Sequence, residues 1–279
     1  SMGESAAAVV SGALTVAEGA LVIVQRSRLL AECAADGGMV SVTGPVEEVQ
    51  ERLAGWEQSL GVAALNSPEN CVVAGYRGAL EQWLTLQSDG VLTFKYLRTA
   101  RVAGHSPCID GLDVELERRL QSLLPRKCST KFMSTVDGIP VDGVALGASY
   151  WARNFRQPVQ FSAAVAGLQN QNVSAFLEIG PHPALASSIH GNAEASGGAD
   201  RVGVMHSLKR DHPELESVLE NAGRLWTLGF DLDWAQVNAG EYRNVDLPSY
   251  PWQRQRFWIE RGAEATPSHS ICRVMAEGE

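Results

Sequence analysis

The sequence predicts an α/β protein composed of a large subdomain, a small ferredoxin-like subdomain and a C-terminal linker. Residues 38–98 show strand and helix patterns in the order β-α-β-β-α-β, which is that of a ferredoxin-like unit. Strand and helix patterns alternate again in the second half of the chain, and 279 residues that are 45% hydrophobic can bury a substantial core. We therefore expect residues 1–37 and 99–243 to form the large subdomain and residues 244–279 to form the linker.

Two helical patterns open the large subdomain. Residues 3–14 are rich in Ala, contain no Pro and carry Glu4 in the first turn, where the helix dipole favours an acidic residue. A second helical pattern covers residues 16–34. The chain is therefore expected to begin with two consecutive helices.

The elements of the small subdomain follow from changes in the hydrophobic period. Pro45 suits the first turn of a helix, and the polar residues 66–70 are typical of a turn between two strands. The predicted strands cover residues 39–43, 62–65, 71–74 and 91–97, and the predicted helices cover residues 45–60 and 77–87.

The rest of the large subdomain alternates between helices and strands. A strand over residues 173–179 runs into Gly180-Pro181-His182-Pro183, after which a helix is expected. The other predicted strands cover residues 132–134 and 202–205, and the other predicted helices cover residues 112–124 and 213–228. Residues 150–168 are predicted to be amphipathic, and residues 262–279 are expected to be a frayed end.

Composition excludes several classes of function. The chain has no uncharged apolar run near 18 residues, so we expect no membrane span, and its net charge of −9 argues against nucleic-acid binding. Its one basic stretch, residues 254–261, also contains aromatic residues, and we interpret it as a segment that packs against neighbouring surface rather than one that binds nucleic acid. The cysteines are odd in number, scattered and never in C-x-x-C pairs, which favours a reducing cytoplasm and argues against a zinc site. We therefore expect no metal.

The first three residues, Ser1-Met2-Gly3, match the second half of the nucleophile elbow G-x-S-x-G. In that motif a strand turns sharply into a helix and exposes the Ser hydroxyl, as in α/β-hydrolase-like folds, so we expect the large subdomain to be of this kind. Three other interpretations of Ser1 stay open at this point. In these interpretations Ser1 is a cloning remnant, a helix N-cap, or an N-terminal nucleophile that uses its own amine as base.

Two further side chains suit chemistry at Ser1. A Ser hydroxyl is a weak nucleophile and needs an adjacent base, and His105 lies among small residues in a loop that follows a strand. Arg26 lies on the second predicted helix, where a buried guanidinium would present a fork to a carboxylate. The alternatives are a surface His and a surface Arg, and Arg28 is interpreted as the surface residue of the two arginines.

Eight segments between Ser1 and Trp258 occur in the order known from one family. They are SMGESAAAVVSGAL, the helix with QRSRLL, AALNSPENCVVAG, VAGHSPCID, YWARNFRQPVQF, FLEIGPHPAL, GFDLDW and LPSYPWQRQRFW. Together they resemble the acyltransferase domain of modular (type I) polyketide synthases, which is similar to malonyl-CoA:acyl carrier protein transacylase. The resemblance implies a ping-pong transfer of a malonyl-type extender from acyl-CoA to Ser and on to the phosphopantetheine thiol of an acyl carrier protein, without a bound cofactor.

The resemblance also implies a role for each matching residue. Ser1 matches the nucleophile, His105 the general base, and Met2 the residue whose backbone N–H forms half of the oxyanion hole. Arg26, which is 25 positions after Ser1, matches the Arg that binds the extender's carboxylate. No triad Asp is implied. The family orients its His by a backbone carbonyl, which we expect near the Gly180–Pro183 segment, with His182 itself structural.

Selectivity is expected to depend on the residues before His105. Malonyl-using members tend to have His-Ala-Phe-His and methylmalonyl-using members Tyr-Ala-Ser-His, whereas this chain has Val102-Ala103-Gly104-His105. Gly104 leaves open the space that Phe would fill, so a methylmalonyl or 2-alkylmalonyl unit is favoured over malonyl. Asn66 resembles a family residue that borders the active site. Trp151, Asn154 and Arg156 lie in a family hallmark that is interpreted as mainly architectural.

The sequence does not contain the family's upstream part, which includes a G-Q-G segment and the strand before the nucleophile. We therefore expect a partial sequence, truncated before Ser1, that is inactive by itself and loosened around residues 1–34 and 173–190. The tail after Asp246 resembles the linker that follows this domain, so an adjacent ketosynthase and its linker are expected partners. The alternatives are a serine acyl hydrolase that edits acyl groups, and an inactive structural module.

Overall fold

The structure is a computed structural model that describes residues 1–33, 35–97, 103–198, 202–237 and 245–257. The chain divides into two compact units, Ser1–Val237 and Asn238–Glu279. Within the second unit, residues 245–257 contain no helix or strand, in keeping with their predicted irregularity. Val102 and the end segment 262–279 lie outside the described residues.

Two helices open the first unit, as predicted. Helix α1 (Met2–Val10) is shorter than the predicted 3–14 because Gly12 adopts a left-handed conformation with φ of 83°, which ends the helix. Helix α2 (Val16–Glu32) begins with a capping box between Thr15 and Glu18. A Cβ on Gly19 would lie 2.5 Å from Val9 Cγ2, so this glycine permits the close approach of α1 and α2.

The small subdomain has the predicted element order. Its elements are β1 (Gly37–Thr43), α3 (Val46–Arg52), β2 (Leu60–Ser67), β3 (Asn70–Tyr76), α4 (Arg77–Thr85) and β4 (Thr93–Tyr96). The four strands form one sheet in the order β2-β3-β1-β4, and all neighbours are antiparallel. Helix α3 ends well before the predicted residue 60, and Gly55, with φ of 87°, lies in the turn that follows.

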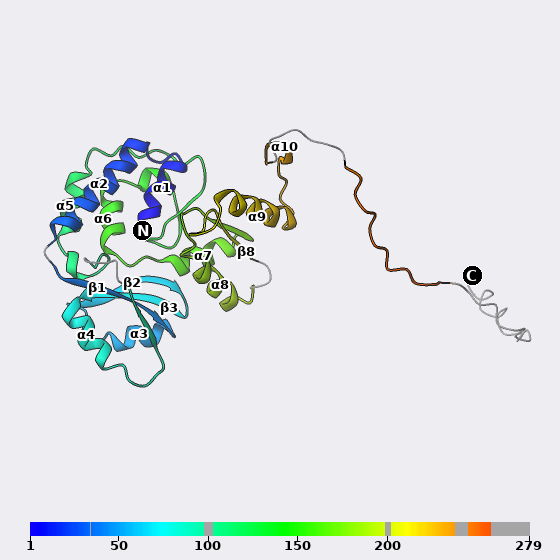
Figure 1. The fold of residues 1–279 in the computed structure, drawn as a ribbon. Coiled ribbons are helices and arrows are strands. Elements are labelled where there is room, and N and C mark those ends of the chain that lie inside the picture. The colour runs from blue at the N-terminus through cyan, green and yellow to red at the C-terminus, as the bar shows by residue number, and fades with distance from the viewer. Residues whose placement is uncertain (34, 98–102, 199–201, 238–244, 258–279) are drawn as a thin grey trace, which may run out of the picture. The chain divides into compact units, whose positions relative to one another are not determined.

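The sheet is buried on both faces. Residues that alternate along its strands, including Val40, Val42 and Val73, pack with α3 and α4 around Trp83, while Val72 and Ala74 point into the core of the large subdomain. Figure 1 shows α3 and α4 on the sheet face away from α1, α2 and α6. The sheet therefore joins the small subdomain to the elements that carry the candidate site.

The large subdomain continues with short strands and longer helices. They are α5 (Leu112–Arg119), β5 (Phe132–Met133), β6 (Pro140–Val141), α6 (Ala148–Arg156), α7 (Phe161–Gln169), β7 (Ala175–Glu178), α8 (Ala186–Ala195), β8 (Gly203–His206), α9 (Glu214–Thr227) and α10 (Trp234–Val237), with 3-10 turns at Pro107–Ile109 and Gly143–Ala145. The sequence did not predict β6 or α10. Strands β7 and β8 pair in parallel, and β5 pairs with β6.

Two helices, α6 and α7, replace the single amphipathic region predicted over residues 150–168. Pro158 lies between them, where it cannot donate the N–H that a continuous helix needs. Trp151 and Phe155 of α6 are fully or almost fully buried in the main core, and Trp151 Nε1 donates to Leu146 O at 2.8 Å. The core thereby anchors α6 beside α1 and α2. None of the helices in the described part of the chain is both long and apolar enough to span a bilayer.

Candidate active site

Ser1 and His105 meet, although 104 positions separate them in the sequence. The Ser1 Oγ lies 2.9 Å from His105 Nε2. Ser1 occupies the N-cap position of α1, but its side chain makes no capping hydrogen bond. The hydroxyl therefore serves the contact with His105 rather than the helix end, which argues against the N-cap interpretation.

The backbone sets the tautomer of His105. Its Nδ1 lies 2.7 Å from Gln157 O, and because a carbonyl only accepts, Nδ1 must carry the proton. Nε2 is then unprotonated and accepts a hydrogen bond from the Ser1 hydroxyl. The expectation that the orienting carbonyl lies near residues 180–183 is wrong. Gln157 provides it, because α6 ends at Arg156 and frees the next carbonyl beside the imidazole.

The loop that carries His105 is held tightly against the sheet. His105 has φ of 57°, a left-handed conformation that costs roughly 1–3 kcal/mol for a residue other than Gly. At the start of β1, a Cβ on Gly37 would lie 2.5 Å from Ala103 N, so only Gly permits this approach. Ala103 itself is fully buried in the main core. Packing thus holds a conformation that the backbone alone disfavours.

Arg26 reaches the same point from α2. Its Nη2 donates to Ser1 Oγ at 2.8 Å and lies 3.5 Å from His105 Nε2, while Nη1 donates to Asn154 Oδ1 at 3.0 Å. The guanidinium also lies over the Phe155 ring, with Cζ 5.3 Å from the centroid. The predicted burial of Arg26 is confirmed, since only 7% of the residue is exposed. Its Nε has no hydrogen-bond partner among the described residues.

Burial and the nearby cation control ionisation at the site. Desolvation, followed by repulsion from Arg26, lowers the pKa of His105 to about 3, against an opposing contribution from the bond to Gln157. Desolvation also lowers the pKa of Arg26 to about 10, although the negative charge of Glu4 acts to raise it. At neutral pH the site therefore holds a neutral imidazole beside a charged guanidinium.

We expect His105 to make the fold acid-sensitive. The unfolded chain binds a proton on this imidazole below its ordinary pKa of 6.5, whereas the folded chain resists protonation until about pH 3. Stability that is present above pH 6.5 is therefore lost as the pH falls, by about 2 kcal/mol between pH 7 and pH 5. Urea unfolding at pH 7 and at pH 5 measures this loss in the free energy of unfolding. In His105→Gln the loss should be smaller by about 2 kcal/mol. An equal loss in both proteins would contradict the assignment.

Glu4 of α1 forms a second layer behind Arg26. It is 7% exposed, and Oε2 accepts from Asn154 Nδ2 at 2.8 Å while Oε1 accepts from Thr135 N at 3.1 Å. The hydroxyls of Thr135 and Tyr150 also donate to it. Desolvation, and then the charge of Glu4, raise the pKa of Tyr150. A chain of contacts thus runs from Glu4 through Asn154 and Arg26 to Ser1.

The other predicted residues lie at varied distances from this cluster. Met2 begins α1, so its N–H is one of the first helical donors, which have no acceptor within the helix. A Cβ on Gly104 would meet no atom within 4 Å, in line with the expected open space. Asn66 Nδ2 donates to Asn70 Oδ1 at 2.9 Å, and its carbonyl accepts from Asn192. Among the described residues, these hydrogen bonds do not connect Asn66 to Ser1, Arg26 or His105.

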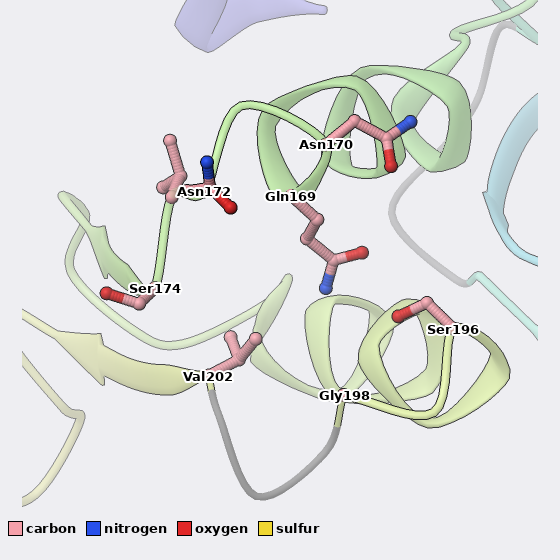
Figure 2. A pocket seen from close by; sticks show the side chains of 8 residues that line it. Gln169, Asn170, Asn172, Ser174, Ser196, Gly198 and Val202 are labelled. Carbon is pink, nitrogen blue, oxygen red and sulfur yellow. The ribbon is translucent and has the colours of Figure 1, made fainter.

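Within the residues that the structure describes, three cavities are lined by predicted site residues. His105 and Arg156 line a cavity of about 300 Å³, and Asn66 lines one of about 650 Å³. Met2 and Gly3 line a mostly apolar cavity of about 920 Å³ at the carboxyl end of β7. A further cavity of about 350 Å³ is lined by Gln169, at the end of α7, and by Ser174 and Val202, which directly precede β7 and β8 (Figure 2). Ligands of parallel sheets bind at the carboxyl ends, so of the two cavities beside β7 the one lined by Met2 and Gly3 suits a substrate better.

Three functional candidates escaped the sequence analysis. Glu4 was interpreted as a dipole-complementing residue, and Asn154 as architectural, whereas both belong to the chain of contacts behind Arg26. Gln157 acts through its backbone, which no side-chain motif can reveal. The one signal for Glu4 was a charged residue within the Ala-rich apolar segment 3–14. No group of three or more His, Cys, Asp or Glu in the described ranges is arranged to hold a metal ion.

Comparisons with known proteins agree on one family. A family model described as an acyl transferase domain matches residues 1–231. The chain is 36% identical over 273 residues to Erythronolide synthase EryA2 of Saccharopolyspora erythraea, an alignment that covers 97% of this chain and 8% of that protein. The chain therefore spans a small part of this curated relative.

Solved structures share the α/β fold. The acyltransferase domain from module 8 of the salinomycin polyketide synthase matches with a TM-score of 0.78 and 33% identity, over 83% of this chain and 54% of that chain. The acyl transferase domain of SpnD, in complex with 2-(pent-4-yn-1-yl)malonyl, matches with a TM-score of 0.71 and 25% identity, over 80% of this chain and 53% of that chain.

Proposed function

Because this chain belongs to the acyl transferase domain family, we propose that it transfers a malonyl-type extender unit from coenzyme A to the phosphopantetheine thiol of an acyl carrier protein. The observation that carries the proposal is the contact of Ser1 with both His105 and Arg26. It unites a nucleophile, a neutral base and a fixed cation at one point. Plain hydrolysis of unsubstituted acyl groups does not require the cation.

The first half-reaction acylates Ser1. His105 Nε2 takes the hydroxyl proton while Ser1 Oγ attacks the thioester carbonyl carbon. The N–H of Met2 is positioned at the helix start to stabilise the oxyanion. When the C–S bond breaks, His105 returns the proton to the departing coenzyme A thiolate. The product is an acyl-Ser1 ester and free coenzyme A.

The second half-reaction repeats these steps with a different thiol. His105 takes the proton of the phosphopantetheine thiol, whose sulfur attacks the acyl-Ser1 ester, and then returns the proton to Ser1 Oγ as the C–O bond breaks. No cofactor resident in this chain is needed. The low pKa of His105 keeps Nε2 free to accept a proton in both steps at neutral pH.

Arg26 is proposed to bind the free carboxylate of the extender. In the structure Nη2 donates to Ser1 Oγ, so a substrate carboxylate would compete for that donor and release the hydroxyl for attack. The Nε donor, which has no partner in the described part of the chain, gives the guanidinium a second group for a bidentate contact.

Product analysis tests this function. The chain, extended by the family's upstream segment, is incubated with radiolabelled malonyl-CoA or methylmalonyl-CoA, with and without carrier protein. We expect label on Ser1 without the carrier, and label on the phosphopantetheine thiol when the carrier is present. Free acid as the sole product in both cases would point to the hydrolase, and a complete lack of label would point to the inactive module.

The extender is proposed to be methylmalonyl or a bulkier 2-alkylmalonyl unit. The open space at Gly104 supports this, and the related SpnD domain was solved with a 2-alkylated malonyl group. Gly104→Phe should fill the space beside the α-carbon and shift preference towards malonyl by roughly 10-fold, since a pocket discriminates one methyl group by ~1–3 kcal/mol. Competition between the two extender-CoAs measures the shift. A wild-type preference for malonyl would contradict the steric argument.

The surroundings of this reaction are also proposals. Residues 1–37 and 99–243 are proposed to form the α/β-hydrolase-like large subdomain, residues 38–98 the ferredoxin-like subdomain, and residues 244–279 a linker after the acyltransferase. The small share of the curated relative that the chain covers supports a place within a larger synthase, next to a ketosynthase and a carrier protein. The scattered cysteines suit the cytoplasm.

A further inference from the structure

The buried carboxylate of Glu4 is not explained by the reaction steps above. It lies in the first turn of α1, three residues after the nucleophile, and is 7% exposed. Burying a carboxylate is costly unless its oxygens accept hydrogen bonds, and four donors from Thr135, Tyr150 and Asn154 meet it here. Of these residues, Asn154 also contacts Arg26.

The amide of Asn154 has one possible orientation. Arg26 can only donate and an ionised carboxylate can only accept, so Asn154 must present Oδ1 to Arg26 Nη1 and Nδ2 to Glu4 Oε2. The two distances are 3.0 and 2.8 Å. If Glu4 were neutral or replaced, Arg26 would still face Oδ1, but Nδ2 would lose the charged acceptor that fixes the position of the amide. The amide thus transmits the position of Glu4 to the guanidinium.

Charge points to the same link. No carboxylate in the described residues forms a direct ion pair with Arg26, and Glu4 is the negative group that acts to raise its pKa against the effect of burial. A buried cation without compensation is costly. Glu4 supplies that compensation with Asn154 between it and Arg26. The side of the guanidinium that faces Ser1 therefore stays free of a carboxylate. A direct ion pair would compete with a substrate carboxylate.

We propose that Glu4 is a positioning residue that, through Asn154, holds Arg26 in place for acyl donors that carry a free carboxylate. The inference rests on the proposed function, since it concerns how Arg26 binds the carboxylate of the substrate. Glu4 itself touches no reacting atom. It determines selectivity between carboxylate-bearing and carboxylate-free thioesters, because only the former use Arg26.

The test compares two acyl donors in wild-type and Glu4→Gln proteins. The variant preserves size but removes the charge and presents an amide to Asn154. We expect the kcat/KM for malonyl-CoA to fall about 10–100-fold relative to that for acetyl-CoA, as for the loss of a charge-assisted hydrogen bond. Partial unfolding would lower both values equally, so the ratio separates positioning from stability. An unchanged ratio would overturn the proposal.

Two further variants sharpen the comparison. Asn154→Ala removes the link itself and should lower the ratio as much as Glu4→Gln does, while the double variant should lower it no further, because both act through one path. If the double variant lowered the ratio by the product of the two single effects, Glu4 and Asn154 would act independently, and the proposed link through Asn154 would be wrong. Glu48→Gln is the matched control, since Glu48 pairs with Arg52 on the small subdomain, and its ratio should equal that of the wild type.

A binding measurement keeps the inference distinguishable from the proposed function. If the wild-type chain, extended by the family's upstream segment, transfers no acyl group, the proposed function fails, and the inference is then judged by thermal shift with malonate and with acetate. Malonate should raise the Tm of the wild type more than acetate does, and Glu4→Gln should lose this difference. Equal shifts in wild type and variant, or no malonate shift in the wild type, would overturn the inference.

Discussion

In a chain extended by the family's upstream segment, replacing Ser1 with Ala is expected to abolish covalent acylation by radiolabelled extender-CoA. The Ser1 hydroxyl is the group placed 2.9 Å from an unprotonated imidazole nitrogen, and Ala offers no oxygen for the ester. Mass spectrometry of the labelled peptide measures the effect. Ser5→Ala is the matched control, because Ser5 lies one turn later in α1 and its hydroxyl donates to Met2 O. Stoichiometric labelling that persists in Ser1→Ala would refute the nucleophile.

His105→Ala belongs to the same prediction. Without the base, acylation of Ser1 should slow by roughly 10²–10⁴-fold, since general-base catalysis contributes about that much. Ser1 would still accept from Arg26, so the loss reflects proton transfer rather than a displaced hydroxyl. Single-turnover acylation measures the rate. A rate within a few-fold of the wild type would show that another group serves as the base.

Arg26→Ala is expected to produce the second large effect, a change of substrate class. Transfer of malonyl-type units should fall by roughly 100-fold or more, as for removal of one partner of a buried charged pair, while acetyl transfer is spared or improved. Arg26→Lys should also be poor with malonyl, because an ammonium replaces the planar fork. Paired kcat/KM measurements with malonyl-CoA and acetyl-CoA show the change.

The control for Arg26 lies two residues further along the same helix. Arg28 is exposed, as predicted, so Arg28→Ala removes a like charge without altering the site. It should leave both substrates unaffected. Equal losses of acetyl and malonyl transfer in Arg26→Ala would indicate that Arg26 only supports the packing of α2 against Phe155.

Much of the small subdomain was predictable because its signals are local. Hydrophobic period, Pro45 and the polar turn near residue 68 depend on neighbours in the chain, and they predicted the order of six elements correctly. Element ends were less accurate. Gly12 shortened α1, and strands β2 and β3 extend into the predicted turn, because glycine conformation and strand pairing depend on contacts that the period does not encode.

The nucleophile, base and cation of the candidate site were all predictable from the amino-acid sequence. Their residue types, together with motif order, were enough to nominate Ser1, His105 and Arg26, because this chemistry needs those side chains. The contacts that orient these three side chains are visible only in the folded chain. Gln157 O sets the tautomer of His105, and Glu4 reaches Arg26 through Asn154, 150 residues away in the chain. These roles arise from backbone carbonyls and long-range packing, which exist only once α1, α2 and α6 meet in the folded core.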